Sequence, residues 1–440
     1  MGKSKLNICV VDNIGGCYLP SAIKLSQYFN KTYYYSVSQN PFPRLSTEMV
    51  GVGYEQIIVI NEFWNKLDLF DLIIFTDIYF NDWGQALRKM GKLVFGGTDG
   101  EFLETNRKLF KDELKKAGMP IATTTYIKGV KNLKSYLSDK KDKWVKISYY
   151  RGEQETFHFI DASHNETTFI EMLYTMGPLE SELEFSIEDP ITSVCESGFD
   201  GWTINGQFTD NCIYGFEIKN AGYVGKKTTK KDLPAPVREC NEKFGPVLAK
   251  YKHTGFYSTE IRCTENGTNY YTDPCMRLGS PPSNTYLEMI SNWDEIIPAA
   301  CQGKLVEPIF KGVYGVEIIL KSNCVNNNFL PVKFPPQYKK NINLKGSFFK
   351  NNEFYIIPFK YTGFELQEFG SVVVVGDDLT KIIDQALSIA AQVEGFDIFY
   401  DANCLEKATD VIRESETYFK NKFSDFKFDA ENYPDEGDIF

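Results

Sequence analysis

The sequence predicts an α/β protein in which an N-terminal parallel sheet is followed by a larger α+β region. Three observations lead to this prediction. Short apolar runs alternate with helical patterns up to residue 103, strand pairs with glycine turns fill the middle of the chain, and strands followed by one clear helical pattern close it. Alternating strands and helices are typical of parallel sheets, whereas strands joined by tight turns are typical of antiparallel hairpins. A chain of 440 residues can bury several such units.

Residues 1–103 are expected to form the parallel α/β domain. Strands are predicted at 6–12, 56–60, 71–77 and 91–97, and helices at 20–29 and directly before the last strand. Ligands of such sheets bind beyond the carboxyl ends of the strands, which Asp12 to Gly16 and Asp77 mark here. A tight turn without a ligand is the alternative interpretation of Gly15-Gly16.

Residues 104–310 are expected to carry the chemistry. The predicted elements are a helix from 104 that ends at Gly118, a hairpin of strands 144–148 and 155–161, a helix at 167–176, a strand at 183–191, strands through 196–216, a helix at 234–252, and a second hairpin of strands 258–264 and 268–274. Glycine and proline after the first helix are typical stop signals.

Residues 311–425 are expected to form a strand-rich C-terminal domain with one long helix. Strands are predicted at 311–322, 353–361 and 370–378, and the helix at 377–395. Asp377 and Asp378 stand where acids stabilise a helix N-terminus. Residues 426–440 form an acidic tail.

Composition excludes several classes of function. The net charge of −11 argues against a general nucleic-acid or membrane-surface binder, although the lysines at 226–227 and 230–231 leave a local basic cleft open beside the simpler interpretation of a solvated loop. Ten cysteines without a CxxC pair and only three histidines supply neither a zinc site nor a Ser-His-Asp triad. Without a signal core or an apolar run of about 20 residues, we expect a cytoplasmic protein.

The second hairpin holds two acids, Glu260 and Asp273. Strand alternation puts Tyr271, Asp273 and Cys275 on one face, and if Glu260 points the same way the two carboxylates suit Mg²⁺. Arg277 follows on that face and can hold a phosphoryl or carboxylate oxygen. A pair of exposed hairpin acids is the alternative.

The Gly279-Ser280 loop after this hairpin offers backbone amides and a hydroxyl to a ligand. Further charged residues precede it. Lys146 ends an apolar strand, before a turn that contains Gly152, and Arg107 lies one helical turn from Lys111. These are groups that phosphates require, and Glu188, Asp189 and Glu196 add acids that suit ribose hydroxyls.

The order of these residues resembles the ATP-grasp superfamily, and most closely the branch that contains phosphoribosylamine–glycine ligase, over nearly the whole chain. The resemblance implies roles for single positions. Lys111 and Lys146 would contact ATP phosphates, with Arg107 and Gly152 at neighbouring family positions; Ile187, Glu188 and Asp189 would form the hinge that holds adenine; Glu196 would bind ribose; Glu260 and Asp273 would bind Mg²⁺; Arg277 would stabilise the transferring phosphoryl group.

The resemblance implies an ATP-dependent carboxylate–amine ligase that works through an acyl phosphate, with ATP and Mg²⁺ as cofactors and small molecules as partners. Two departures from the family pattern matter. Cys275 replaces the asparagine of the third metal position, and Gly15-Gly16 lacks the Arg-Glu-His that follows it in the purine enzyme. The loop therefore offers no obvious cation for a ribose phosphate, and we expect a different acceptor. A nucleotide-binding protein with degraded catalysis, and a kinase or carboxylase of the same fold, are the alternatives.

Overall fold

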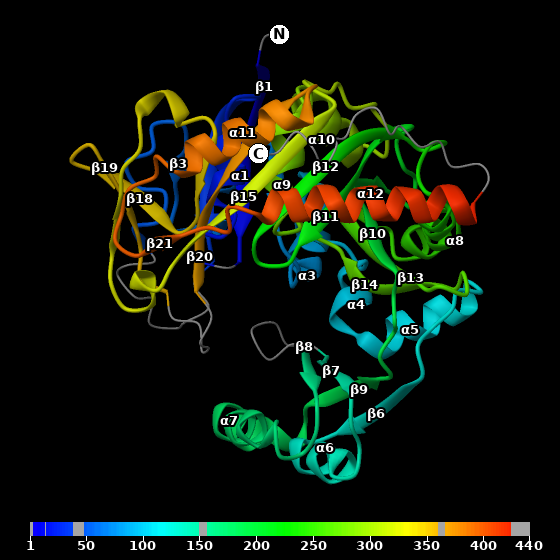
Figure 1. Ribbon diagram of the computed structural model, residues 1–440. Helices are drawn as coiled ribbons and strands as arrows, with labels where there is room; N and C mark the ends of the chain where they lie inside the picture. Colours follow the sequence, from blue (N-terminus) through cyan, green and yellow to red (C-terminus); the bar gives the residue numbers. More distant parts are fainter. Residues whose placement is uncertain (1–2, 14, 38–47, 149–155, 360–365, 424–440) are drawn as a thin grey trace.

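The computed structural model describes residues 3–13, 15–37, 48–148, 156–359 and 366–423 (Figure 1). Within these ranges the chain is 33% helical and 32% strand. Its strands form sheets of five, nine, three and four strands. The predicted turn at Arg151-Gly152 and the acidic tail lie outside the described residues.

The N-terminal sheet is parallel, as predicted, with the strand order β3-β2-β1-β4-β5. Its elements are β1 (Ser4–Asp12), α1 (Leu19–Leu25), β2 (Phe29–Ser36), β3 (Ile58–Val59), the 3-10 turn Trp64–Leu69, β4 (Leu72–Phe75), α3 (Asn81–Lys89) and β5 (Leu93–Phe95). The helix predicted at 20–29 is too long, because α1 ends at Leu25. The next run, FNKTYYYS, is rich in the aromatic residues that favour strands and forms β2.

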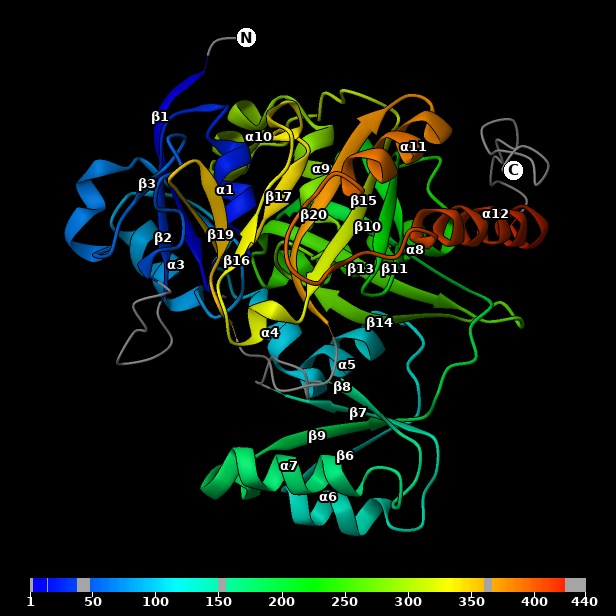
Figure 2. The same ribbon diagram turned by 60° about the vertical axis from the view of Figure 1, so that its left-hand side comes forward.

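Residues 124–188 form a small unit with its own sheet, in the order β6-β9-β7-β8. It contains β6 (Thr124–Lys128), α6 (Val130–Leu137), β7 (Lys143–Ile147), β8 (Thr156–Phe159), α7 (Glu166–Met176), the 3-10 turn Gly177–Ser181 and β9 (Glu184–Glu188). The predicted hairpin is present as the antiparallel pair β7–β8. A separate hydrophobic core holds the unit together. Figure 1 and Figure 2 show it projecting from the rest of the molecule on two extended connections.

The nine-stranded sheet is the centre of the molecule, with the order β14-β13-β10-β11-β12-β15-β20-β17 and β21 beside β15. Its strands are β10 (Cys195–Ile204), β11 (Asn211–Ile218), β12 (Gly222–Thr229), β13 (Thr254–Cys263), β14 (Asn269–Cys275), β15 (Tyr314–Ser322), β17 (Ile342–Leu344), β20 (Gln367–Gly376) and β21 (Ile398–Phe399). Strands from both sides of the boundary at residue 310 share this sheet, and the domain division stays a prediction.

Helices and a small sheet surround the central sheet. They are α4 (Glu101–Thr105), α5 (Arg107–Lys116), α8 (Ala235–Lys250), α9 (Ser283–Met289), α10 (Trp293–Cys301), α11 (Leu379–Ala390) and α12 (Cys404–Lys422), with β16 (Leu330–Val332), β18 (Ser347–Lys350), β19 (Glu353–Ile356) and the 3-10 turns Cys324–Asn326 and Pro336–Tyr338. One continuous core joins β1 and α1 to α9, α10 and β10. The N-terminal sheet is therefore packed firmly against the central one.

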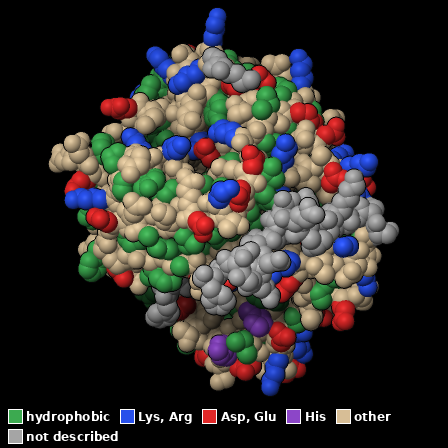
Figure 3. Space-filling model, turned by 45° about the horizontal axis from the view of Figure 1, so that its top comes forward, with side chains coloured by type: hydrophobic (Ala, Val, Ile, Leu, Met, Phe, Trp, Pro, Cys, Tyr) green, Lys and Arg blue, Asp and Glu red, His purple; other side chains and the backbone are tan. Residues whose placement is uncertain are grey.

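Helix α12 was not predicted, although it has 19 residues and lies along β10, β11 and β12 (Figure 1). Its Glu416 is buried and accepts a hydrogen bond from Tyr214 Oη at 3.0 Å. Lys226 on β12 forms an ion pair with Glu416 at 3.2 Å. One of the lysines considered for a basic cleft thus neutralises a buried acid. The face in Figure 3 carries acids and bases side by side.

None of the helices in the described ranges is long and apolar enough to cross a membrane.

Candidate functional site

The hairpin of β13 and β14 places Glu260 directly opposite Asp273. A β-bulge at this point makes Tyr271 pair with Ile261, so that Thr272 is the extra residue. Residues directly opposite share a face, whereas neighbours on a strand do not. The prediction that Tyr271 and Asp273 share a face is therefore wrong: Tyr271 joins the hydrophobic core, and Asp273 lies on the face of Glu260.

Two cations lie near Asp273, one paired with its carboxylate and one bonded to the neighbouring residue. Arg107, buried at the start of α5, forms an ion pair with its carboxylate. Lys146 on β7 donates a hydrogen bond to the carbonyl oxygen of Thr272 at 3.2 Å. Burial would raise the pKa of Asp273, but Arg107 and Lys146 outweigh burial and lower this pKa to about 2. Asp273 is therefore an ionised carboxylate at neutral pH.

A second group of charges lies where the small unit meets α5. Lys111 Nζ lies 3.2 Å from Glu188 Oε1, and Lys146 Nζ lies 3.9 Å from Glu188 Oε2. All three side chains are buried. Burial lowers the pKa of Lys111, and the charge of Glu188 opposes that shift. Next to them, Asp189 pairs with Lys143 at 2.6 Å.

Arg262 lies between two of the predicted site acids. Its Nη2 is 3.1 Å from Glu196 on β10, and its Nε is 3.2 Å from Glu260. Lys219 lies 3.8 Å from the other oxygen of Glu260. Burial and the charge of Glu260 raise the pKa of Glu196, and Arg262 lowers it. Arg262 and Lys219 were not predicted, although Arg262 follows Glu260 by two residues, the spacing of one strand face.

Arg277 is held by acids from other elements. Its Nε donates to Glu104 Oε1 at 2.8 Å and lies 3.6 Å from Asp77 Oδ1, beyond the end of β4. The other oxygen of Glu104 accepts from the backbone N–H of Met276 at 2.7 Å. Glu104 thus fixes the chain and the side chain at this position, and sequence patterns gave no indication of that role. The Sγ atom of Cys275 lies 3.5 Å from the carbonyl oxygen of Arg277.

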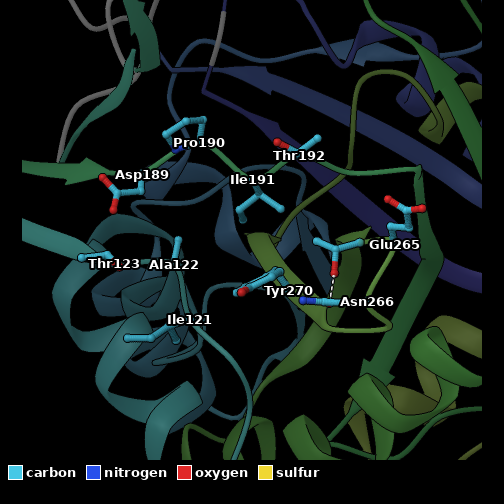
Figure 4. Close-up of a pocket in the computed structure, with 11 residues that line it drawn as sticks. Ile121, Ala122, Thr123, Asp189, Pro190, Ile191, Thr192, Glu265, Asn266 and Tyr270 are labelled. Carbon is cyan, nitrogen blue, oxygen red and sulfur yellow. Dashed lines mark hydrogen bonds between the residues drawn. The ribbon is translucent and has the colours of Figure 1, made fainter. Parts of the chain in front are cut away.

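A pocket of about 630 Å³ lies beside the predicted hinge (Figure 4). Its walls are residues 121–123, the segment 189–192 that continues from Ile187 and Glu188, the turn 264–266, and Tyr270. Tyr270 pairs with Arg262 and therefore lies on the same face of the sheet. In Figure 4 the Tyr270 ring lies below Ile191 and to the right of Ile121 and Ala122. The pocket thus opens on the face that carries the charged residues.

The N-terminal loop meets two distant segments. Gly15 and Gly16 have positive φ values of +49° and +100°, and the backbone N–H of Gly346 donates to Gly16 O at 2.8 Å. A Cβ on Gly16 would lie 2.5 Å from Gly346 Cα, so only glycine fits there. Gly279 and Ser280 follow Leu278, whose N–H donates to Thr76 at the end of β4.

A cation from a distant segment lies next to this loop. Lys345, the neighbour of Gly346, donates to Ser280 Oγ at 2.7 Å. Lys345 comes directly after β17, in the C-terminal part of the chain. No local sequence pattern connects it with Gly16.

The predicted metal ligands Glu260 and Asp273 form a pair and not a larger cluster in the part of the chain that the structure describes. Among the side chains that the structure describes, no group of three or more histidines, cysteines and acids is arranged to hold a metal ion. Gly152 lies outside the described residues, so its place relative to Lys146 is not part of this geometry.

No protein-family model matches the chain, and no curated protein does so either. Solved structures do match. Phosphoribosylamine–glycine ligase from Thermotoga maritima superposes with a TM-score of 0.66 at 14% identity, over 90% of this chain and 100% of that one. The L-amino acid ligase from Bacillus licheniformis gives 0.57 at 14% identity, over 91% and 100%. The biotin carboxylase domain of 2-oxoglutarate carboxylase from Hydrogenobacter thermophilus gives 0.57 at 13%, over 93% and 99%.

The identities are low, and the shared feature is the arrangement of the chain. The three matching proteins have the ATP-grasp fold, and the match extends over at least 90% of this chain in each case. The predicted resemblance is thereby confirmed at the level of structure: the chain has the ATP-grasp fold.

Proposed function

We propose that the protein is an ATP-dependent ligase that joins a small carboxylate to a small amine. One observation carries the proposal: Lys146 of the small unit reaches Thr272, beside Asp273 of the central sheet. The buried cations and the opposed carboxylates thus face one site between the two units. Two of the matching proteins are ligases, and the carboxylase domain was crystallised with MgADP and ADP, which supports ATP and Mg²⁺ as ligands here.

The residues present fit a nucleotide. The pocket beside segment 189–192 has the ring of Tyr270 and the side chain of Ile191, which suit the flat apolar faces of adenine. The carboxylate of Glu196, which pairs with Arg262 on the face where the pocket opens, suits the ribose hydroxyls.

The phosphates have their own set of partners. Arg107, Lys111 and Lys146 are buried cations that converge from α5 and β7. In the structure Asp273 and Glu188 form ion pairs with these cations, which orients them before a ligand arrives. Such preorganised charges stabilise a transferring phosphoryl group without further rearrangement.

The carboxylates fit Mg²⁺. Glu260 and Asp273 supply hard oxygen ligands from opposite strands, and in such sites substrate phosphates and water complete the shell. Cys275, a poor ligand for Mg²⁺, shares the face of Asp273 but contributes nothing to this oxygen set. When bound, the metal neutralises phosphate charge; the protein supplies the two acids that hold it.

The reaction consists of two balanced steps. A carboxylate oxygen attacks the γ-phosphorus of ATP, the bond from that phosphorus to the β,γ-bridging oxygen breaks, and ADP leaves. The amine nitrogen then attacks the acyl carbon, the C–O bond to phosphate breaks, and inorganic phosphate and one proton are released. In this proposal Arg277, which Glu104 orients, stabilises the oxygens of the acyl phosphate. No covalent enzyme intermediate is required.

An ADP-release screen across pairs of carboxylates and amines tests the proposal, with mass spectrometry of the products. We expect one ADP and one phosphate for each condensed product. Phosphate retained in the product would indicate a kinase, and bicarbonate-dependent turnover would indicate a carboxylase. Tight ATP binding without turnover on any pair would indicate degraded catalysis.

A further inference from the structure

Lys345 is a buried cation in a polar junction of three segments. Only 8% of the residue is exposed. Its ammonium donates to Ser280 Oγ at 2.7 Å and to Glu368 Oε1 at 2.5 Å. An ammonium has three N–H donors, and within the described ranges the third has no hydrogen-bond acceptor.

The junction is accessible from outside. Ser280 is exposed, and the side chain of Glu368 is 28% exposed. Gly15 is exposed on the adjoining loop, while Gly16 is packed against Gly346. The exposed Ser280 hydroxyl, which accepts from the ammonium, thus connects the buried Lys345 with the surface.

The charges around Lys345 are mainly negative. Burial raises the pKa of the nearby Cys17 thiol to about 11, Lys345 lowers it, and Asp12 and Glu368 raise it. Glu317, also near Lys345, is buried and accepts hydrogen bonds from Asn284 and Thr285. A ligand that brings only an anion would be repelled by these acids, whereas one that also carries an ammonium group would not.

The junction adjoins the predicted reaction centre. Ser280 follows Arg277 by three residues, and the intervening Leu278 is fixed on both sides: its N–H donates to Thr76 O at 3.1 Å, and its carbonyl accepts from Tyr18 Oη at 2.9 Å. Lys345, through Ser280, and Arg277 are thereby attached to the two ends of one short loop.

We propose that Lys345 and Ser280 bind the carboxylate of a zwitterionic amino-acid acceptor, and that Glu368 occupies Lys345 until this acceptor arrives. The subsite deepens the proposed ligase function and rests on it, because the acceptor's amine is the nucleophile of the second step. The acceptor's carboxylate takes the place of the partly exposed Glu368 carboxylate on the ammonium, and the acids of the junction favour the acceptor's ammonium group before that group loses its proton.

Two readouts keep the subsite separate from the ligase function. The first is calorimetric binding of proteinogenic α-amino acids, and of their amides, to the full chain with MgADP present. The second is ADP release with the same probes in the presence of ATP and candidate carboxylates. Phosphoethanolamine and ethanolamine form a further pair, which distinguishes a phosphate from a carboxylate as the anion.

We expect amino acids to bind more tightly than their amides. Lys345→Met should weaken amino-acid binding roughly 10- to 100-fold and leave amide binding unchanged, because only the charged contact is lost. Glu368→Gln should strengthen amino-acid binding, since it releases the ammonium. Ser280→Ala, at an exposed hydroxyl, is the variant to rely on if Lys345→Met does not fold, and Lys350→Met on β18 is the exposed control.

Equal binding of acids and amides, or amino-acid binding that neither Lys345→Met nor Ser280→Ala changes, would overturn the subsite. Lys345-dependent binding of phosphoethanolamine alone would overturn the assignment of a carboxylate. Lys345-dependent binding of amino acids without ADP release on any carboxylate would support the subsite and contradict the ligase function.

Discussion

Arg262 Nη2 lies 3.1 Å from Glu196, while Nε of the same guanidinium lies 3.2 Å from Glu260. One cation therefore holds two acids for which the ATP-grasp resemblance implies different ligands, ribose and Mg²⁺. A metal ion that binds Glu260 must compete with Arg262 for that carboxylate.

This competition predicts the effect of Arg262→Gln. Removing the cation should lower the Mg²⁺ concentration for half-maximal ADP release by roughly 3- to 10-fold, because a nearby charge interaction of about 1 kcal/mol is lost. Mg²⁺ titrations at saturating ATP measure it. Lys243→Gln on α8, also a cation near an acid, is the control and should leave the titration unchanged. A higher Mg²⁺ requirement in Arg262→Gln would contradict the competition.

The carboxylate pair should be essential. Glu260→Gln or Asp273→Asn should reduce ADP release at least about 100-fold at matched Mg²⁺, since each removes a negative charge that holds the metal. Circular dichroism and thermal melting should show a folded protein in both cases. Glu239→Gln, an exposed acid on α8, serves as the control. Near-wild-type turnover in either site variant would refute the metal assignment.

Cys275 is expected to be a substitution at the third metal position and not a nucleophile. Cys275→Asn should keep or increase the rate of ADP release, because an amide oxygen is a better ligand for Mg²⁺ than a thiol. Steady-state kinetics at varied Mg²⁺ measure the effect. An inactive but folded Cys275→Asn protein, together with a covalent adduct on the wild-type thiol, would reverse this interpretation.

Glu101 predicts a pH dependence of stability. Its Oε2 accepts from the backbone N–H of Phe80 and Asn81 at 2.8 and 3.1 Å, while its Oε1 has no hydrogen-bond partner among the residues described. Burial raises its pKa to about 8. Above the ordinary pKa of a glutamate the unfolded chain releases the proton of Glu101, whereas the folded protein keeps it up to about pH 8. The contribution of Glu101 to stability is therefore highest at low pH and falls as the pH rises toward 8.

The slope of that loss is at most about 1.4 kcal/mol per pH unit. Glu101→Gln keeps an oxygen for the two backbone donors and removes the charge, so its free energy of unfolding should change less between pH 5 and about pH 8. Denaturant unfolding across this range measures the difference. Glu62→Gln, at an exposed position, should leave the wild-type profile intact. Parallel profiles for wild type and Glu101→Gln would contradict the buried, protonated acid.

The sequence predicted the elements whose signals are local. The turn-rich segment between Glu260 and Asp273 predicted the hairpin, and the N-terminal strands were found from their apolar runs. The bulge at Thr272 was not predictable, because it depends on how two strands pair and not on either strand alone. Helix α12 was missed although its buried residues recur at helical spacing, because no element was predicted between the helix at 377–395 and the acidic tail.

The residues of the site also divide into those with a local sequence signal and those without one. Acids and cations next to a strand end or a glycine turn, such as Lys146, were identified from sequence. Glu104 and Lys345 were not, since each acts on a residue far along the chain: Glu104 on Arg277, and Lys345 on Ser280. Such pairs depend on how three segments meet in the folded molecule, and a single sequence carries no signal of that meeting.

The bulge at Thr272 has a second consequence, for the behaviour of the protein in concentrated solution. Within the described sheet β14 is an edge strand, whose outer backbone groups could pair with a strand of another molecule. Bulges and prolines interrupt such pairing, and β14 has both, at Thr272 and Pro274. The irregularity that turns Asp273 toward Glu260 therefore also protects the open edge of the sheet from self-association.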